Sequence, residues 1–273
     1  MKKLLPLLGL YALVAAGAAV ASMPFVWMIG TAFKTYPESI SASFRVFPRD
    51  WQLRNFYDAM IAAPFPTYFF NSFLVAGIVT IGVVVTALCM GYAFARLHFP
   101  GRGALFFIVL ATMMIPFEVT LIPNFILINR LGWYDSYLAL TVPWLASAFA
   151  VFLVRQSLLA LPRDYDDAAR MDGCGHLRML VFVAAPLVKP ALMTAALFAF
   201  LGSYNALVWP LIVTGSEGMR LVQVGLTVFT GDQGTRVNLL MAASTVIMAP
   251  TVLLYFLAQR YFLDSALGSG LKA

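Results

Sequence analysis

The sequence is poor in charged residues, and this scarcity excludes an ordinary soluble domain. Only 11% of the 273 residues are Asp, Glu, Lys or Arg, whereas 62% are hydrophobic and the mean hydropathy is +0.86. Soluble domains carry about 25% charged residues. The net charge of +6 fits basic loops beside anionic lipid head groups. We therefore expect membrane lipid, and no nucleic acid, as a partner.

Residues that build redox, metal and nucleotide sites are also missing. The two cysteines, Cys89 in an apolar run and Cys174 in a charged one, indicate no disulfide framework. No His, Cys, Asp and Glu residues recur at metal-ligand spacing, and no nucleophile–base pattern is present. The Walker A pattern that cradles ATP phosphates is absent as well. The sequence predicts no enzyme activity and no metal or cofactor bound by this chain.

Long apolar runs fill most of the chain and predict an all-α polytopic membrane protein. The runs are continuous rather than alternating, which is typical of spanning helices and not of barrel strands. A span needs about 20 residues, so the chain has room for six helices. The expected transmembrane helices of this single domain, residues 1–273, cover about 5–33, 67–95, 104–128, 136–159, 187–214 and 237–260.

The first apolar run imitates a secretory signal, because Lys2 and Lys3 precede it and Ala19-Val20-Ala21 resembles a cleavage site. The run nevertheless continues to Phe33, whereas the apolar region of a signal holds about 7–15 residues. We expect an uncleaved first helix, followed by a long polar outer loop over residues 34–66.

Basic residues indicate how the helices are oriented. With both termini and the segment 161–186 in the cytoplasm, 11 Lys and Arg residues lie inside and 7 outside. Four of those seven belong to the outer loop. The positive-inside rule therefore predicts cytoplasmic termini.

The segment 161–186 is too charged to cross a membrane. It holds seven charged residues, each costing about 2.5–3.5 kcal/mol at a helix centre. Pro162 and three following aspartates favour a helix start. Asp172-Gly173 supplies a stop with a residue that tolerates positive φ. A second helical run from about His176 ends near Pro186, so we expect two short helices at the membrane face.

The spacing in this segment resembles the EAA loop of ABC importer permeases. Ala168, Ala169, Gly173 and Pro186 hold the family positions, and Asp167 stands where the family has glutamate. Two apolar residues before Pro186 differ from the family's isoleucine and leucine. Small alanines suit a helix that fits a partner's cleft, and glycine permits the turn back to the bilayer. The alternative role for Asp167 is helix capping.

The resemblance covers nearly the whole chain and points to the carbohydrate-uptake branch, to the smaller permease of maltose-type importers. Phe47-Pro48 and Trp51, Trp209-Pro210-Leu211, and Gln259-Arg260-Tyr261-Phe262 are similar to segments of those permeases. It implies a cytoplasmic coupling helix between the fourth and fifth spans. The residues expected to couple to an ATPase are Asp166, Asp167, Ala168, Ala169, Arg170, Met171, Asp172, Gly173 and Pro186.

The same resemblance implies partners and a location. The partners are a second, homologous permease that forms a heterodimer with this chain, a dimer of ATPase subunits that binds ATP and Mg²⁺, and an extracytoplasmic substrate-binding protein. The location is the bacterial cytoplasmic (inner) membrane.

The fifth apolar run offers candidate cargo contacts. Phe198, Gly202, Asn205 and Trp209 recur at helical spacing, with Tyr204 beside them. Aromatic rings and an amide suit the C–H faces and hydroxyls of a sugar. Packing against a neighbouring helix is the alternative role.

Glu118 is the one acid deep inside an apolar run. Such acids usually face a cavity, a partner or an interface, so both a pathway role and a place near the outer mouth stay open. A proton relay would need an intramembrane Asp or His beside it, and the expected spans contain neither.

We expect the permease subunit of a bacterial ATP-driven importer that moves a di- or oligosaccharide by alternating access. Glycerol 3-phosphate or a polyol is the alternative cargo, although a phosphate would favour Arg or Lys in the pathway. A proton-coupled secondary carrier is the alternative from another class. A membrane-anchored scaffold would not need the charged, glycine-turned loop.

Overall fold

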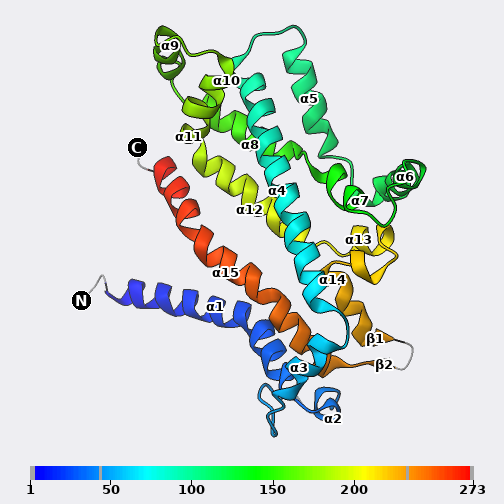
Figure 1. The fold of residues 1–273 in the computed structure, drawn as a ribbon. Coiled ribbons are helices and arrows are strands. Elements are labelled where there is room, and N and C mark those ends of the chain that lie inside the picture. Colours follow the sequence, from blue (N-terminus) through cyan, green and yellow to red (C-terminus); the bar gives the residue numbers. More distant parts are fainter. Residues whose placement is uncertain (1–3, 43–44, 232–233, 271–273) are drawn as a thin grey trace. The chain divides into compact units, whose positions relative to one another are not determined.

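The computed structural model of the chain describes residues 4–42, 45–231 and 234–270, and it is mainly helical (Figure 1). Lys2, Lys3 and Lys272, which entered the charge count above, lie outside the described residues. The chain forms two compact units, Met1–Phe65 with Gly225–Pro250 and Pro66–Val224 with Thr251–Ala273.

The first unit joins the amino-terminal helix to a small cap. Its elements are α1 (Leu4–Ala32), α2 (Tyr36–Ser39), α3 (Arg54–Ile61), η4 (Leu226–Phe229), β1 (Thr230–Gly231), β2 (Gly234–Thr235) and the beginning of α15 (Val237–Gly270). The two short strands pair antiparallel, with Thr230 opposite Thr235.

The end of α1 is held by the outer loop. Asn55 of α3 donates from Nδ2 to the carbonyls of Ala32 and Lys34, both at 2.8 Å. Asn238 of α15 in turn donates to Asn55 Oδ1 at 3.2 Å. These bonds satisfy carbonyls that a helix end leaves without partners. Within the described residues of this loop, 34–42 and 45–66, α2 and α3 are helical.

The second unit contains a large hydrophobic core. Its elements are α4 (Phe65–Arg96), α5 (Arg102–Thr112), α6 (Phe117–Arg130), α7 (Tyr137–Thr141), η1 (Val142–Trp144), α8 (Ala148–Leu159), α9 (Asp164–Met171), α10 (His176–Arg178), η2 (Met179–Ala184), α11 (Ala185–Leu187), α12 (Lys189–Tyr204), α13 (Val208–Val213), η3 (Glu217–Met219) and α14 (Val222–Gly225). Figure 1 shows α4, in cyan, running from the neighbourhood of α14 to that of α10. Valines and an alanine at every fourth position of α4 are buried.

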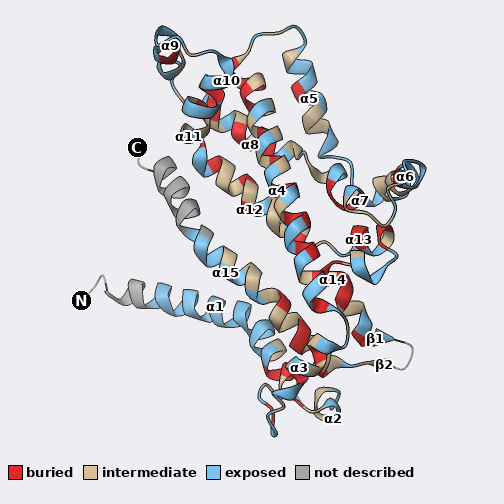
Figure 2. Cartoon of the chain, viewed as in Figure 1, coloured by how far each residue is buried: buried red, intermediate tan, exposed pale blue. Residues whose placement is uncertain are grey.

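Four described helices are long and apolar enough to cross a membrane, and the number rises to six if each of two bent helix pairs is one span. The four are Gly9–Ala32, Phe65–Arg96, Tyr137–Leu159 and Val237–Leu257. The apolar residues of α1 from Gly9 to Val26 are exposed, as Figure 2 shows, which suits lipid or a partner subunit as their surroundings.

Of the expected helices over 104–128, 136–159 and 187–214, the first and the third are bent, which corrects their interpretation, whereas the second is one candidate span, Tyr137–Leu159. The first bends by 96° between α5 and α6, and Pro116 is the residue that immediately precedes α6. The second passes through the 3₁₀ helix η1, which contains Pro143. In the third, an 83° bend precedes Lys189, and helix is interrupted again between Tyr204 and Val208. Proline removes a backbone donor and restricts the residue before it, so helices break there.

Glycines let α4 approach its neighbour closely. A Cβ on Gly91 would lie 2.8 Å from Val154 Cγ1 and 3.2 Å from the backbone nitrogen of Arg155 in α8. Small residues at such crossings allow close packing of membrane helices. Gly77, in the same helix, has nothing within 4 Å of that position.

Gly91→Ala is expected to lower the thermal midpoint of the detergent-purified protein, because overpacking costs about 1–3 kcal/mol. Gly77→Ala is the matched control and should leave the midpoint unchanged or raise it, since alanine favours helix. Equal midpoints for the two variants would contradict the close α4–α8 contact.

Candidate functional site

A cavity of about 540 Å³ lies inside the second unit, between α4, α8, α12 and α13. This volume is in the range of pockets for small molecules, about 300–1,000 Å³. The described residues that line it are Val75, Val79, Val83, Phe117, Leu140, Trp144, Ala146, Ser147, Phe149, Ala150, Ala195, Phe198, Ala199, Gly202, Ser203, Ala206, Leu207, Val208, Trp209, Pro210 and Leu221.

Aromatic side chains form much of the cavity wall and hold one another in fixed orientations. The rings of Trp144 and Trp209 meet edge to face with centroids 6.1 Å apart, and those of Phe149 and Phe198 do so at 5.7 Å. Trp209 Nε1 also donates to the carbonyl of Ala139 at 2.9 Å, which fixes the indole. Among the described lining residues none is charged, and hydroxyls come only from Ser147 and Ser203.

The structure brings together three of the five residues expected on the fifth apolar run. Phe198, Gly202 and Trp209 line the cavity, whereas Tyr204 and Asn205 are not among its lining residues. The expected single helical face is wrong, because α12 ends at Tyr204 and α13 begins at Val208. An uninterrupted helix would press the ring of Pro210 against the carbonyl four residues earlier.

Asn205 and Tyr204 have other contacts. Asn205 donates from Nδ2 to the carbonyl of Leu201 at 2.9 Å and accepts from Gln223 Nε2 at 3.1 Å. Tyr204 is buried, with its ring against those of Phe73 and Phe200 at 5.4 and 5.7 Å. Both residues therefore shape the end of α12 rather than the cavity wall.

Glu118 is exposed in the first turn of α6, next to Phe117, which lines the cavity. Its carboxylate lies where the helix dipole favours an anion. Glu118 itself is not among the lining residues.

The sequence interpretation missed the part of the wall that comes from α4. Val75, Val79 and Val83 are spaced by four and share one helix face. That spacing was visible, but small apolar residues at helical spacing are equally typical of packing. The aromatic Trp144 and Phe149 were missed because only the fold brings their segment beside α12.

The charged segment 161–186 folds as two helical pieces joined by a glycine turn, as expected. Helix α9 ends at Met171, and Gly173 has φ of 75°, which confirms the predicted stop. The amide of Cys174 donates to the carbonyl of Ala169 at 2.9 Å, closing the turn. The second piece is α10, the π-helix η2 and α11, which contains Pro186.

The two faces of α9 differ. Ala169 is buried at 8% exposure, and the Asp166 side chain is only 14% exposed. Asp167, Ala168, Arg170, Met171, Asp172 and Gly173 are exposed. Asp167 and Arg170 approach each other at 3.8 Å with both side chains more than half exposed. These outward side chains remain free to meet another surface.

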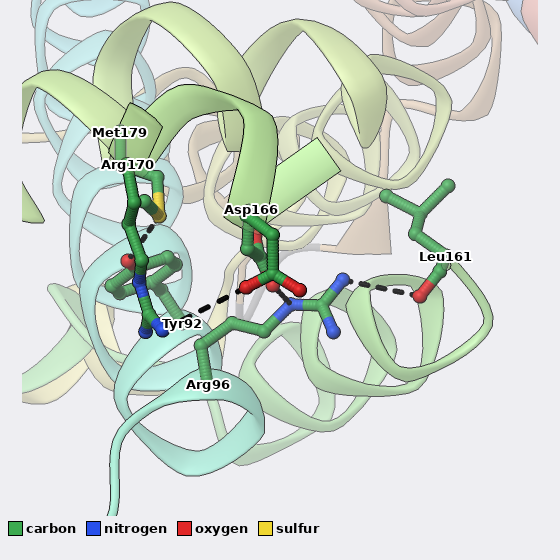
Figure 3. A network of polar contacts seen from close by, with 7 residues as sticks. Tyr92, Arg96, Leu161, Asp166, Arg170 and Met179 are labelled. Atoms are coloured by element: carbon green, nitrogen blue, oxygen red, sulfur yellow. Dashed lines mark hydrogen bonds and ion pairs between the residues drawn. The ribbon is translucent and has the colours of Figure 1, made fainter. Parts of the chain in front are cut away.

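The inner face of α9 is tied to the end of α4 (Figure 3). Arg96 Nε lies 3.0 Å from Asp166 Oδ2, and Arg96 Nη2 donates to the carbonyl of Leu161 at 3.2 Å. One turn earlier on α4, the Tyr92 hydroxyl donates to Met179 Sδ at 3.0 Å. The sequence alone does not reveal this pairing, because contacts between segments far apart in the chain leave no local signal.

A turn on the far side of the unit is held by Asp135. Its carboxylate accepts from the amides of Gly215 and Ser216 at 2.9 and 3.1 Å, and its backbone has φ of 56°. Burial alone would raise the pKa of the Asp135 carboxyl, but the hydrogen bonds from Ser216 and Gly215 outweigh it and hold this pKa below its ordinary value.

Comparison with known proteins gives one family. A family model described as "Binding-protein-dependent transport system inner membrane component" matches residues 87–266. The arabinooligosaccharides transport system permease protein AraQ of Bacillus subtilis is 35% identical over 205 residues, which cover 75% of this chain and 73% of AraQ. The sn-glycerol-3-phosphate transport system permease protein UgpE of Yersinia enterocolitica is 34% identical, covering 76% of this chain and 75% of UgpE.

A solved structure agrees with these matches. A chain of a bacterial ABC transporter involved in the import of the acidic polysaccharide alginate superposes with a TM-score of 0.80. The sequences are 22% identical, and the match covers 95% of this chain and 97% of that one. At this identity the likeness establishes a shared fold.

Asp135→Asn tests the turn beside α13. Asn tolerates positive φ and keeps an acceptor oxygen, so the variant removes mainly the charge. Because the folded pKa is lowered, the carboxylate stabilises the fold above the unfolded pKa, and this contribution is lost as pH falls through the folded pKa. The thermal midpoint of the wild type should exceed that of the variant at pH 7, and the gap should close in acid.

Asp50→Asn, at an exposed aspartate of the other unit, is the matched charge-removal control. A constant difference between wild type and Asp135→Asn at all pH values would contradict the role of the Asp135 charge.

Proposed function

The chain belongs to the family of binding-protein-dependent transport system inner membrane components, the permeases of ABC importers, and we propose that its cargo is a neutral di- or oligosaccharide. It is a transporter subunit and not an enzyme. The family membership favours an importer over a proton-coupled carrier.

The cavity carries the proposal about cargo. Its described wall is aromatic and aliphatic with two serine hydroxyls and no charged side chain. Aromatic faces pack against the C–H faces of sugar rings, and hydroxyls exchange hydrogen bonds with theirs. A phosphate would require Arg, Lys or several N–H donors, since a buried charge without a partner is very costly. Of the cargoes that the relatives' names print, an oligosaccharide fits this wall better than glycerol 3-phosphate.

Six spans account for the helices of the one permease domain expected over residues 1–273. They are α1, α4, the bent pair α5–α6, the segment α7–α8, the pair α12–α13, and α15. An even number of spans places both termini on one side of the bacterial inner membrane, and the basic residues favour the cytoplasm. This assignment puts Arg96 and the charged loop together on the cytoplasmic side.

Helix α9 serves as the coupling helix that docks an ATPase subunit. Its outward side chains Asp167, Ala168, Arg170 and Met171 support this role, as does the tight turn at Gly173. ATP and Mg²⁺ bind to the ATPase dimer and not to this chain. A second permease completes the pathway, and a binding protein delivers the saccharide. Hydrolysis then shifts the permease pair between inward-open and outward-open states.

Gly173→Ala is expected to weaken ATPase docking, because φ of 75° costs an L-residue about 1–2 kcal/mol. Gly173→Pro should abolish docking while the chain still inserts, since proline fixes φ near about −65°. The measurement is the amount of ATPase chain that co-purifies with the tagged permease in mild detergent.

Gly175→Ala is the control, because Gly175 lies in the same loop at an ordinary φ of −74°. If all three glycine variants retained the ATPase equally, α9 and its turn would not be the docking element.

Gly202→Leu tests the cavity as the cargo pathway. Gly202 lines the cavity, and nothing lies within 4 Å of the position of an added Cβ, so leucine narrows the space without disturbing the fold. Uptake of the saccharide bound by the co-purifying binding protein should fall about tenfold or more, the usual effect of a steric misfit.

Gly77→Leu adds the same side chain at an equally open position that does not line the cavity. It should keep uptake near the wild-type rate. Normal uptake by Gly202→Leu would contradict the pathway assignment.

A further inference from the structure

Helix α4 connects the cavity to the charged loop without a break. It runs from Phe65 to Arg96, and its valines at 75, 79 and 83 line the cavity. Its last turns carry Tyr92 and Arg96, which contact the loop. At 1.5 Å per residue, Val83 and Arg96 are about 20 Å apart along the axis. A continuous helix of this length transmits displacement and rotation from one end to the other.

The polypeptide that joins α9 to the helices of the cavity wall is not continuously α-helical. Toward α12 the chain passes through the π-helix η2 and an 83° bend, where Val188 leaves helical geometry with φ of −100° and ψ of 17°. Toward α8 the chain leaves helix after Leu159 and re-enters it at Asp164. Breaks and π-helical turns are places where helices bend. When α9 moves, these segments bend, so the chain itself transmits little of the movement to α8 or α12.

The contact between α9 and α4 is a buried ion pair, in which Arg96 Nε approaches Asp166 without the alignment of a hydrogen bond. The side chains of Arg96 and Asp166 are 7% and 14% exposed, and their atoms are 3.0 Å apart. Separating them would leave each charge in poorly solvated surroundings without its partner. Arg96 Nη2 also donates to the carbonyl of Leu161, the second residue after α8, and this hydrogen bond fixes the guanidinium.

Two adjacent aspartates of α9 thus have opposite surroundings. Asp166 points inward to Arg96, whereas the Asp167 side chain is 69% exposed and 3.8 Å from an equally outward Arg170. Successive residues on a helix are about 100° apart, so one can hold the protein while the other faces a partner.

A further cation braces the same end of α4. Arg155 of α8 donates from Nε to the carbonyl of Phe94 at 3.3 Å, and its guanidinium lies 4.0 Å from the ring centroid of Phe106 in α5. The cytoplasmic ends of α4, α5 and α8 are thereby fixed to one another. A push on Arg96 reaches helices that form two walls of the cavity.

We propose that Arg96 and Asp166 are the positioning pair that passes movement of α9 to α4, so that α9 and the cytoplasmic end of α4 move as one rigid body throughout the cycle. This inference rests on the proposed function, in which a docked ATPase moves α9. The cavity wall is then shifted by α4, and the chain connection through η2 bends to follow.

The test measures access to the cavity without needing the cargo. In the complex purified with its partner subunits, Cys89 and Cys174 are replaced by alanine and Ser203→Cys supplies a thiol in the cavity wall. A membrane-impermeant maleimide labels proteoliposomes with and without ATP, Mg²⁺ and vanadate. In this parent we expect the nucleotide to change the labelling rate about fivefold or more, the usual lower range of coupling between sites.

Asp166→Asn and Arg96→Gln, each introduced into this parent, should abolish the nucleotide-dependent change in labelling. In Arg96→Gln, which changes no residue of α9, ATP hydrolysis and the amount of co-purifying ATPase should stay near the parent values. Asp164→Asn, an exposed change in the same helix, is the control and should keep the full change in labelling.

A variant that fails to fold is recognised by its thermal midpoint, and Arg96→Lys then carries the test. Lysine keeps the charge beside Asp166 but loses the fork that reaches Leu161, so the change in labelling should be intermediate. A full change in labelling with Arg96→Gln or Asp166→Asn would overturn the inference. Loss of the ATPase from Arg96→Gln would also overturn it, because the pair would then serve docking. A parent that retains no ATPase would overturn the proposed function, and the inference with it.

Discussion

The ion pair between Arg96 and Asp166 is the contact on which the second unit depends, because it joins a charged loop to a helix made for an apolar environment. Seven charges exclude the loop from a bilayer, while the end of α4 is buried among α5, α8 and η2. Because Asp166 neutralises Arg96, the charged loop contacts the buried end of α4 without leaving an unpaired charge there. The neighbouring Tyr92–Met179 and Arg155–Phe94 hydrogen bonds add polar contacts there, and Arg155 brings a second, half-buried cation.

The cavity wall is uncharged and largely apolar, whereas the loop 161–186 is charged and exposed, and the two regions suit different partners. The described cavity wall offers aromatic surface and two hydroxyls, which suit an uncharged, hydroxyl-rich cargo. The loop exposes carboxylates, a guanidinium and Met171, which suit a protein surface. Helix α4 contributes to both regions. A permease needs such a connection, because a partner's movement is useful only if it alters the cavity.

The sequence predicted those features of the structure that depend on residues close together in the chain. Helices α1, α4 and α15 follow long apolar runs, and the stop at Gly173 follows from the demand for positive φ. The bends at Pro116 and before Lys189 were missed because hydropathy measures how apolar a run is and not its direction. Asn205 was counted among the candidate cargo contacts by extending helical spacing past the end of α12. The partner of Arg96 was invisible, because 70 residues separate it from Asp166 and no spacing rule connects them.

The most direct measurement is a cross-link from the two adjacent alanines of α9, with Cys89 and Cys174 replaced. Ala168 is exposed and Ala169 is buried, so a cysteine at the first position reaches a docked partner and one at the second does not. We predict that Ala168→Cys forms an adduct with the ATPase chain in native membranes and that Ala169→Cys forms none. No ATPase adduct from Ala168→Cys, or an equally strong one from Leu53→Cys in the outer loop, would contradict the assignment of α9 as the coupling helix.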